Sequence, residues 1–247
     1  MKQKYYLSIL CLVFLFTTRT YAYDFSVDGI YYNYINNKTE MEVAGADMSK
    51  FPDGKIVIPE KVNFSNRYFD VTSIGNTAFR NFSGLTSITI PESVTSIGGS
   101  AFEGCSGLIS ITIPESVTSI GANAFQDCTG LTSIIIPKSV TSIGANAFQG
   151  CINLNSITIP ESVTSIGSNA FQDCTGLTSI IIPKSVTSIG VKVFQGCSKL
   201  NTVTIQDGFT SIGNSVFYGC TGLTSITIPE SVTSIGANAF QDCNYET

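Results

Sequence analysis

Seven cysteines at one fixed spacing are the residues of this chain with the clearest potential for chemistry. They stand 23 residues apart, at Cys105, Cys128, Cys151, Cys174, Cys197, Cys220 and Cys243. A row of thiols could bind a metal or form a chain of disulfides, and neighbours ~5 Å apart would be close enough for a bridge. However, the Cys-x-x-Cys spacing of zinc sites is absent, seven is odd, and Phe82 takes the equivalent place in the first repeat. We interpret the row as buried free thiols and predict no metal site.

Composition removes most other chemistry. The 247 residues include no histidine and no tryptophan, which excludes His-based acid/base catalysis, Ser-His or Cys-His nucleophiles and imidazole metal ligands. Carboxylates remain, but those of the repeats lie on separate turns with no discernible pocket. With 13 Lys+Arg against 18 Asp+Glu, the net charge is −5, so no basic field attracts nucleic acid. We predict no enzyme, no catalytic residue, no cofactor and no nucleic-acid partner.

An internal repeat positions these residues. The sequence Val-Thr-Ser-Ile-Gly at 94–98 returns every 23 residues, with Phe209 replacing the valine once, and the register holds from Val71 to the end. This gives seven full units and a partial eighth, 232–247. The units 117–139 and 163–185 differ only at Ala122 and Ser168, so a 46-residue pair has been duplicated.

One unit cannot fold alone. Its eight apolar side chains supply roughly 12–20 kcal/mol, whereas ordering 23 residues costs roughly 35 kcal/mol. Each unit must therefore bury its apolar edge against its neighbours, as in a solenoid. In the unit 117–139, the segment 131–136 is β-rich and Pro137 ends it, a second extended piece covers 117–120, and we expect Gly121 to turn at positive φ. The prediction is an α/β to mainly β solenoid, with parallel strands on one face and short turns or single-turn helices on the other.

Stacking places equivalent side chains in columns. The predicted core columns include Phe102, Phe125, Phe148 and Phe171, together with Cys105, Cys128, Cys151 and Cys174. An aromatic platform for sugars is the alternative interpretation of the Phe column. On the outward side of the strands the central column reads Thr89, Thr112, Ile135, Thr158, Ile181, Thr204 and Thr227. We take this column as the candidate ligand-binding face, and a plain β-favouring surface is the equally weighted alternative.

Charges also follow the stack. The position after the strand-ending proline, or its equivalent, alternates in sign over five units: Glu115, Lys138, Glu161, Lys184 and Asp207. Opposite neighbours at ~5 Å attract weakly. We interpret this row as a solvated face that keeps the stack soluble, and not as a catalytic or calcium site.

The first 70 residues differ from the repeats. Lys2 and Lys4 precede an apolar run over 5–16, and the small residue Ala22 offers a cleavage point, so 1–22 is predicted to be a cleaved signal peptide. The run is too short to span a membrane, and no transmembrane segment is expected after its removal. Residues 23–70 are predicted to form a cap on the solenoid 71–247, with a hairpin around Asp28-Gly29 and a degenerate repeat over 56–79.

The unit Leu-x-x-Ile-x-Ile-Pro followed by Val-x-x-Ile-Gly-x-x-Ala-Phe-x-x-Cys resembles the BspA-like, treponemal-type leucine-rich repeats of 23 residues. The resemblance covers 71–247. It implies a secreted or cell-surface bacterial protein that adheres to host matrix proteins or to other cells.

Two functions follow as expectations. The first is a non-enzymatic protein-binding or adhesion module, supported by the resemblance and by the exclusion of enzymes. The alternative is a structural protein that associates with itself through the open edge of its last coil. Ordering of water on the Ser-x-Thr rows, as in ice-binding solenoids, is a third interpretation that Ile135 and Ile181 disfavour.

Overall fold

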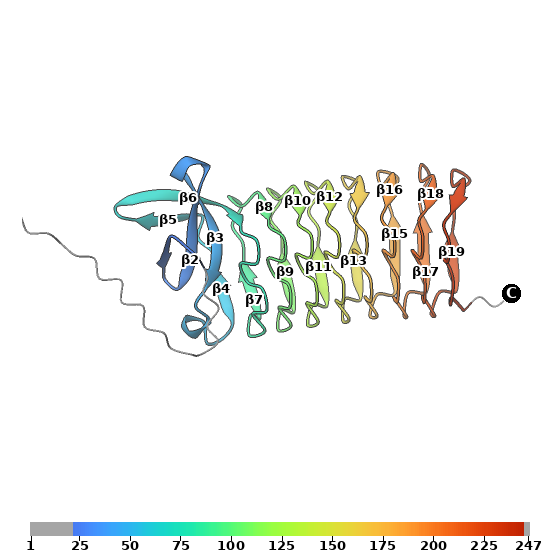
Figure 1. Cartoon of the computed structure of the whole chain (residues 1–247), viewed down its shortest axis with the longest axis horizontal. Coiled ribbons are helices and arrows are strands. Elements are labelled where there is room, and N and C mark those ends of the chain that lie inside the picture. The colour runs from blue at the N-terminus through green and yellow to red at the C-terminus, as the bar shows by residue number, and fades with distance from the viewer. Residues whose placement is uncertain (1–21, 245–247) are drawn as a thin grey trace, which may run out of the picture.

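The computed structural model describes residues 22–244, which wind as a coil along one long axis (Figure 1). Each repeat forms one turn of this coil and contributes two short strands on different sides. Residues 1–21 of the predicted signal peptide lie outside the described residues. Among residues 22–244 there is no α-helix, and none of the described segments could cross a membrane as a helix.

The strands form three groups. The N-terminal region holds β1 (Phe25–Val27), β2 (Ile30–Ile35), β3 (Glu40–Ala46), β4 (Lys55–Val57), β5 (Lys61–Phe64), β6 (Arg67–Ile74) and the 3-10 turns η1 (Asn36–Lys38) and η2 (Met48–Lys50). One side of the repeats holds β7 (Ser87–Thr89), β9 (Ser110–Thr112), β11 (Ser133–Ile135), β13 (Ser156–Thr158), β15 (Ser179–Ile182), β17 (Thr202–Ile205) and β19 (Ser225–Thr227). The other side holds β8 (Ser96–Ile97), β10 (Ser119–Ile120), β12 (Ser142–Ile143), β14 (Ser165–Ile166), β16 (Ser188–Ile189), β18 (Ser211–Ile212) and β20 (Ser234–Ile235).

Equivalent residues of successive repeats lie beside each other. Ile134 of β11 pairs in parallel with Ile111 of β9 and Ile157 of β13, so the register shift is one full repeat. On the other side, Ile120 of β10 pairs with Ile97 and Ile143. The predicted solenoid of parallel strands is confirmed, and its connecting segments are turns.

The two sides differ in continuity. On the β8 side, one ladder runs from β1 through β2, β3 and β6 to β16, and β18 pairs separately with β20. On the other side there are three ladders, β4–β7, β9–β11–β13 and β15–β17–β19. We call the outward surface of this second side the strand face.

The N-terminal strands continue the solenoid. β1 and β2 form an antiparallel hairpin whose two-residue turn is Asp28-Gly29, with φ of 50° and 84°, as a primed turn requires. β3 then pairs in parallel with β6, which places the hairpin over the edge of the long ladder. β4 pairs in parallel with β7 and so begins the strand face. The boundaries 1–22, 23–70 and 71–247 themselves stay a prediction.

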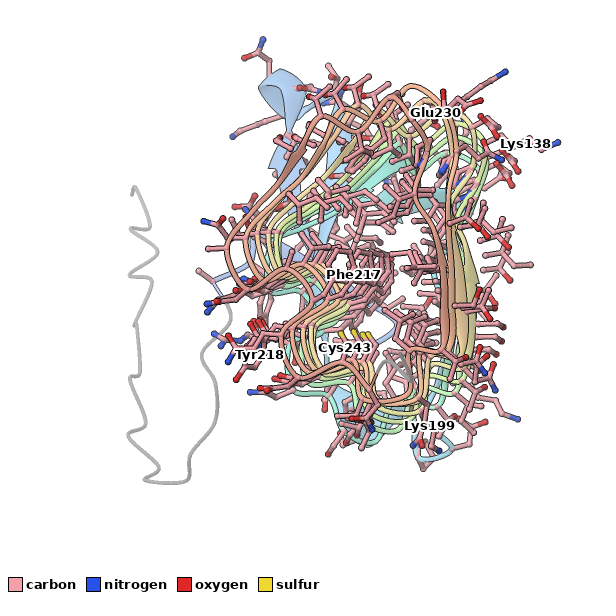
Figure 2. All side chains as sticks on the ribbon, turned by 90° about the vertical axis from the view of Figure 1, so that its right-hand side faces the viewer. Lys138, Lys199, Phe217, Tyr218, Glu230 and Cys243 are labelled. Carbon is pink, nitrogen blue, oxygen red and sulfur yellow. The ribbon has the colours of Figure 1, made fainter. Side chains whose placement is uncertain are left out.

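Columns of aromatic rings and sulfur atoms fill the core. The rings from Phe79 to Phe240 stack with centroids 5.3–5.5 Å apart and nearly parallel planes. Figure 2 shows Phe217 inside the coil and the sulfur atoms gathered beside it. Because each ring contacts the next, the coils bury one another, as the energetic argument requires.

The expected role of Gly121 is wrong in one respect. Positive φ occurs two residues later, at Asn123, with φ of 58°. Gly121 is needed because a Cβ atom there would lie 2.7 Å from the carbonyl carbon of Gly98 in the preceding coil. Close stacking of the backbones therefore selects glycine at this position.

Candidate functional site: the strand face

The strand face is produced by a simple alternation. In the Ser-Ile-Thr and Ser-Ile-Ile strands from β7 to β13 the central isoleucine is buried and the residues on either side of it are exposed. In β19 the central Ile226 is half-buried. Because side chains alternate between the two sides of a strand, the solvent-facing positions of each of these strands hold only serine, threonine or isoleucine. The result is an outward surface made of parallel columns.

All seven residues of the predicted ligand-binding column lie on this face. Thr112, Ile135 and Thr158 are paired partners in one ladder, and Ile181, Thr204 and Thr227 are paired partners in the next. Thr89 stands at the equivalent place in β7 and is exposed. Thr204 is half-buried and the others are exposed, so the position of the column is as expected, while ligand binding by it stays a prediction.

The column begins one coil earlier than the sequence interpretation placed it. Val57 of β4 pairs with Thr89 and is 68% exposed. The signal for Val57 was present in the sequence, because Ile56-Val57-Ile58-Pro59 repeats the Ile-x-Ile-Pro pattern that ends each later strand. The column therefore has eight members.

The isoleucines make the middle of this face apolar. Ile135 is 74% exposed and Ile181 is 57% exposed, with the smaller Thr158 between them. A hollow of about 930 Å³ lies over β11, β13 and β15, lined by these three residues. Single exposed aliphatic residues are ordinary on protein surfaces, but two large ones beside a hollow form a site that an apolar partner could fill.

Charged side chains border this hollow. Glu115, Lys138 and Glu161 line it at the ends of the strands, and Lys138 projects outward beyond the strand layer in Figure 2. Within residues 22–244 the ion pairs are Lys61–Asp70 and Arg80–Glu103, so neither involves the alternating row. The charges of the row are therefore exposed and without a direct ionic partner in the coil.

The cysteine column is hydrogen-bonded along its whole length. Each thiol donates a hydrogen bond to the carbonyl of a phenylalanine in the preceding coil, as Cys128 Sγ does to Phe102 O at 3.1 Å. Burial raises the pKa of Cys105 and of Cys151 to about 12. Across residues 22–244 the structure has these cysteines as free thiols, and Cys105, Cys128, Cys151 and Cys174 are 0% exposed. Protonated, hydrogen-bonded thiols are poor nucleophiles and poor metal ligands.

The Phe column has the same inward location. Phe102, Phe125, Phe148 and Phe171 are 0% exposed, so none of these rings is available to a sugar. The strand face is thus the surface where the two large aliphatic side chains, the hollow and the alternating charges occur together.

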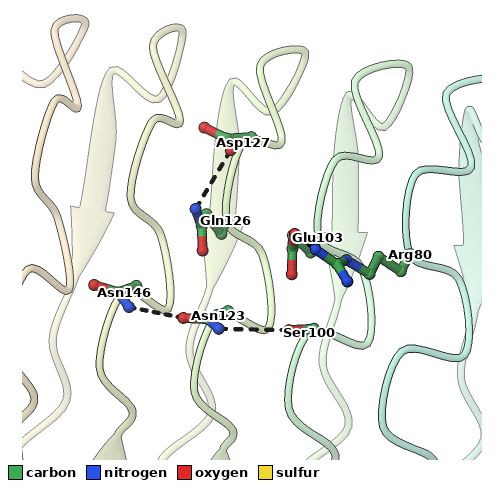
Figure 3. A network of polar contacts seen from close by, with 7 residues as sticks. All are labelled: Arg80, Ser100, Glu103, Asn123, Gln126, Asp127 and Asn146. Carbon is green, nitrogen blue, oxygen red and sulfur yellow. Dashed lines mark hydrogen bonds and ion pairs between the residues drawn. The ribbon is translucent and has the colours of Figure 1, made fainter.

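A second row of polar groups lies in the turns that follow the strands β8, β10 and β12, and we call this part of the coil the turn side. Asn146 Nδ2 donates to Asn123 Oδ1 at 2.8 Å, and Asn123 Nδ2 lies 3.5 Å from Ser100 Oγ (Figure 3). The Arg80–Glu103 ion pair and the Gln126–Asp127 contact lie beside this row. The Asn–Asn, Asn–Ser and Arg80–Glu103 contacts join neighbouring coils, whereas the Gln126–Asp127 contact lies within one coil. Because these groups already have partners, the row favours a structural role.

Solved structures resemble the chain along most of its length. A leucine-rich repeat protein from Bacteroides ovatus is 28% identical, with a TM-score of 0.50, over 90% of this chain and 80% of that chain. A leucine-rich cell surface protein from Faecalibacterium prausnitzii is also 28% identical, with a TM-score of 0.59, over 89% of this chain and 74% of that chain. The leucine-rich repeat protein of T. pallidum, at 24% identity, has a TM-score of 0.60 over 89% of this chain and 88% of that chain, and shows the shared fold.

No curated protein matches the sequence. The family model described as the BspA type leucine-rich repeat region matches residues 59–144 and 119–247, which together span most of the chain. The family resemblance is thereby confirmed, and the chain belongs to the BspA-type leucine-rich repeat family.

Proposed function

We propose that this chain is an exported, non-enzymatic protein that binds a protein partner at the bacterial cell surface or outside the cell. Membership of the BspA-type family supports a binding role. The similar protein of F. prausnitzii is described as a cell surface protein, which supports the location. The signal-like N-terminus of the sequence supports export.

One observation carries the proposal: the strand face is a broad, regular surface with an apolar centre. Ile135 and Ile181 stand exposed beside a hollow that Thr158 shares. The face offers no tyrosine, tryptophan or arginine, which are the residues that anchor tight interfaces. We therefore expect modest affinity per contact, raised where several copies act together.

Binding is tested with a panel of immobilised extracellular-matrix proteins and the full chain. The double variant Ile135→Thr/Ile181→Thr gives the face the residue that most other coils carry, so the fold should be kept while the apolar centre is lost. We expect binding to fall about tenfold or more. Ile152→Thr is the matched control, because Ile152 is 44% exposed in a turn outside the strands. Equal binding by the double variant would contradict the assignment of the face.

Export is tested separately by mass spectrometry of the protein isolated from cells. We expect the mature chain to start at Tyr23 and to be degraded by protease added to intact cells, or to be found in the medium. An intracellular chain that keeps residues 1–22 would contradict export and leave the binding test unaffected.

A further inference from the structure

Two properties of the strand face alternate with the same period. From β9 to β15 the central column reads Thr112, Ile135, Thr158, Ile181, so small and large side chains alternate. The row at the strand ends reads Glu115, Lys138, Glu161, Lys184, so the charges alternate over the same four coils. Both patterns descend from the duplicated 46-residue pair, and all four charged side chains are exposed.

A row of four charges that alternate in sign is complementary to its own reversed copy. A twofold axis that runs parallel to the strands, just outside the face and midway between β11 and β13, turns a second copy to face the first with the coil order reversed. Strand ends then meet strand ends. Reversal brings Glu115 opposite Lys184 of the second copy and Lys138 opposite Glu161 of the second copy, and symmetry doubles both contacts. Every one of these four contacts joins opposite charges.

The same rotation matches the shapes. Ile135 comes opposite Thr158 of the second copy, and Ile181 comes opposite Thr112 of the second copy. Thr158 lies in the hollow between the two isoleucines, so each protruding Ile135 meets a recess. Charge and shape therefore favour the same arrangement, although each results from a different set of residues.

We propose that the strand face over β9–β15 is a self-complementary interface, and that its partner is a second copy of this chain. The inference rests on the proposed function, because it names the partner of the same face. It also explains why charges that form no ion pair within the coil alternate over these coils.

The size of the matched area sets the expected strength. Four coils at ~4.8 Å span ~19 Å, and a strand with its flanks is of similar width, so each copy buries on the order of 400 Å². A standard interface buries about 800 Å² per partner. The dimer is therefore weak, with a dissociation constant of about 10 µM or above, and it becomes effective where many copies share one surface.

The register of the dimer is fixed by the hollow. A twofold axis shifted by one coil would pair the row from Lys138 to Asp207, whose charges alternate equally well. The hollow is lined by Glu115 and not by Asp207, so it favours the axis between β11 and β13. In the register proposed here, the next residues outward are Glu92 and Asp207, which face each other with the same sign. Complementarity thus ends at the edges of the four coils, and this mismatch provides a test.

Sedimentation equilibrium of the full chain, from about 5 to 500 µM, measures the association. We expect a monomer–dimer equilibrium that weakens with added salt. A strict monomer at the highest concentration overturns the inference. If that monomer still binds an immobilised protein, and Ile135→Thr/Ile181→Thr abolishes the binding, the proposed function stands and the self-partner is wrong.

Charge variants test the pairing. Lys184→Glu places like charges at two symmetric contacts, and we expect the dissociation constant to rise about tenfold or more. Adding Glu115→Lys to Lys184→Glu should restore it. Lys199→Glu makes the same change of net charge at an exposed lysine away from the face (Figure 2) and should have no effect. An equal weakening by Lys199→Glu would show a general charge effect and overturn the pairing.

Replacing the like-charge contact at the edge of the interface by an opposite-charge contact should raise the affinity of the dimer. Asp207→Lys faces Glu92 of the second copy, so we expect the dissociation constant to fall several-fold. A weaker dimer in Asp207→Lys overturns this register. Ile235→Ser, on the last described coil, is the control for association through that end of the stack. Loss of the dimer in this variant would place the interface there and overturn the proposal.

Discussion

The coils over residues 94–185 closely repeat one sequence, and we call them the regular coils. The coil over 186–208 keeps the 23-residue pattern but departs from that sequence at Val191, Lys192 and Val193, and we call it the irregular coil. The two regions differ in the hydrogen bonds that join them to neighbouring coils. In the regular coils, Thr N–H and Gly N–H groups of each coil donate to the coil before it, as in Thr164 to Thr141 at 2.9 Å and Gly167 to Ile143 at 2.9 Å. At the joint after the irregular coil, no such bond links Thr210 or Gly213 to that coil within the described residues. The long ladder ends there, at β16.

The glycines show that the two coils at this joint lie further apart than neighbouring coils elsewhere. A Cβ atom added at Gly190 or Gly236 would lie 2.3 Å or 2.5 Å from the preceding coil. At Gly213 the nearest atom would be 3.4 Å away. Phe209 explains the difference, because it occupies the place of a valine in the other coils and is 1% exposed. A larger side chain in the same layer holds the two coils apart.

The opening is confined to one side of the stack. β17 pairs with β15 and β19 on the strand face, so that side is continuous through the irregular coil. On the turn side, Phe194 N–H donates to Val216 O at 2.9 Å, and the rings of Phe194 and Phe217 stack at 5.5 Å. A solenoid coil is thus held by three separate rows of contacts, and two of them suffice to keep its register.

The joint before the irregular coil has a different defect. Asn169 Oδ1 and Ser185 Oγ are buried there without a hydrogen-bond partner. The asparagine row stops at Asn169 because the next coil carries Lys192 at that position, with φ of 59°. In the regular coils the equivalent serines donate to the backbone, as Ser162 does to Val140 O at 2.7 Å.

The largest expected effect concerns the thiol column, which crosses both regions unchanged. Burial raises the pKa of the six thiols from Cys105 to Cys220, so the folded chain keeps protons that the unfolded chain loses above pH 9. This contribution is fully present below pH 9 and is lost as the pH rises from 9 toward the raised pKa of each thiol, which is about 12 for Cys105, Cys151 and Cys220. Above pH 9 we expect the free energy of unfolding to fall by on the order of 1 kcal/mol per pH unit for each thiol that stays protonated in the folded chain, so the whole column gives a fall several times steeper than one thiol does.

Urea denaturation between pH 8 and 10 measures this loss. Cys151→Ala should reduce the slope by about one sixth, since one titrating group is removed. A denaturation midpoint that does not move with pH would contradict the buried thiol column in both regions.

Removing a ring from the regular region has the next largest effect. Phe148→Ala leaves a cavity between two stacked rings, and we expect a loss of about 3–5 kcal/mol in the free energy of unfolding. Phe240→Ala, in the last described coil where the ring is half-buried, should cost less than half as much. Equal losses in urea denaturation would mean that the coils do not depend on neighbours on both sides.

Phe209 itself can be exchanged with its regular counterpart. Phe209→Val should let the long ladder close, and the amides of Thr210 and Gly213 should then exchange with deuterium up to about tenfold more slowly. The reverse change, Val186→Phe, should open the preceding joint and cost about 1–3 kcal/mol. If Thr210 and Gly213 exchange equally fast in Phe209→Val, the phenylalanine is not what separates the coils.

The sequence was sufficient to predict the stack, because a strict repeat forces equivalent residues into columns. It indicated the turn Asp28-Gly29 and the inward direction of the Phe and Cys columns. It did not show the open joint, because Phe209 matches the pattern as an apolar residue and the cost of its size depends on how closely the coils approach. Gly121 was misjudged for the same reason: its contact is with the neighbouring coil, which local turn rules do not include.

The candidate site shows the same limit. The outward column could be predicted from alternation, except that Val57 was left out, although its degenerate repeat was recognised, because the insertion that holds β5 and β6 separates its strand from the regular units. The hollow between Ile135 and Ile181 could not be predicted, since its volume depends on how the backbone ladders break between β13 and β15.

The smallest expected effect comes from the buried amide at the joint before the irregular coil. Lys192→Asn supplies the side-chain donor that Asn169 Oδ1 lacks, and asparagine also tolerates the positive φ at this position better than lysine does. We expect the free energy of unfolding to rise by about 1 kcal/mol. Lys192→Ala removes the same charge without an amide, so it should not be stabilising. If urea denaturation shows the same gain for alanine, the charge of Lys192 and not the interrupted asparagine row distinguishes the irregular coil from the regular ones.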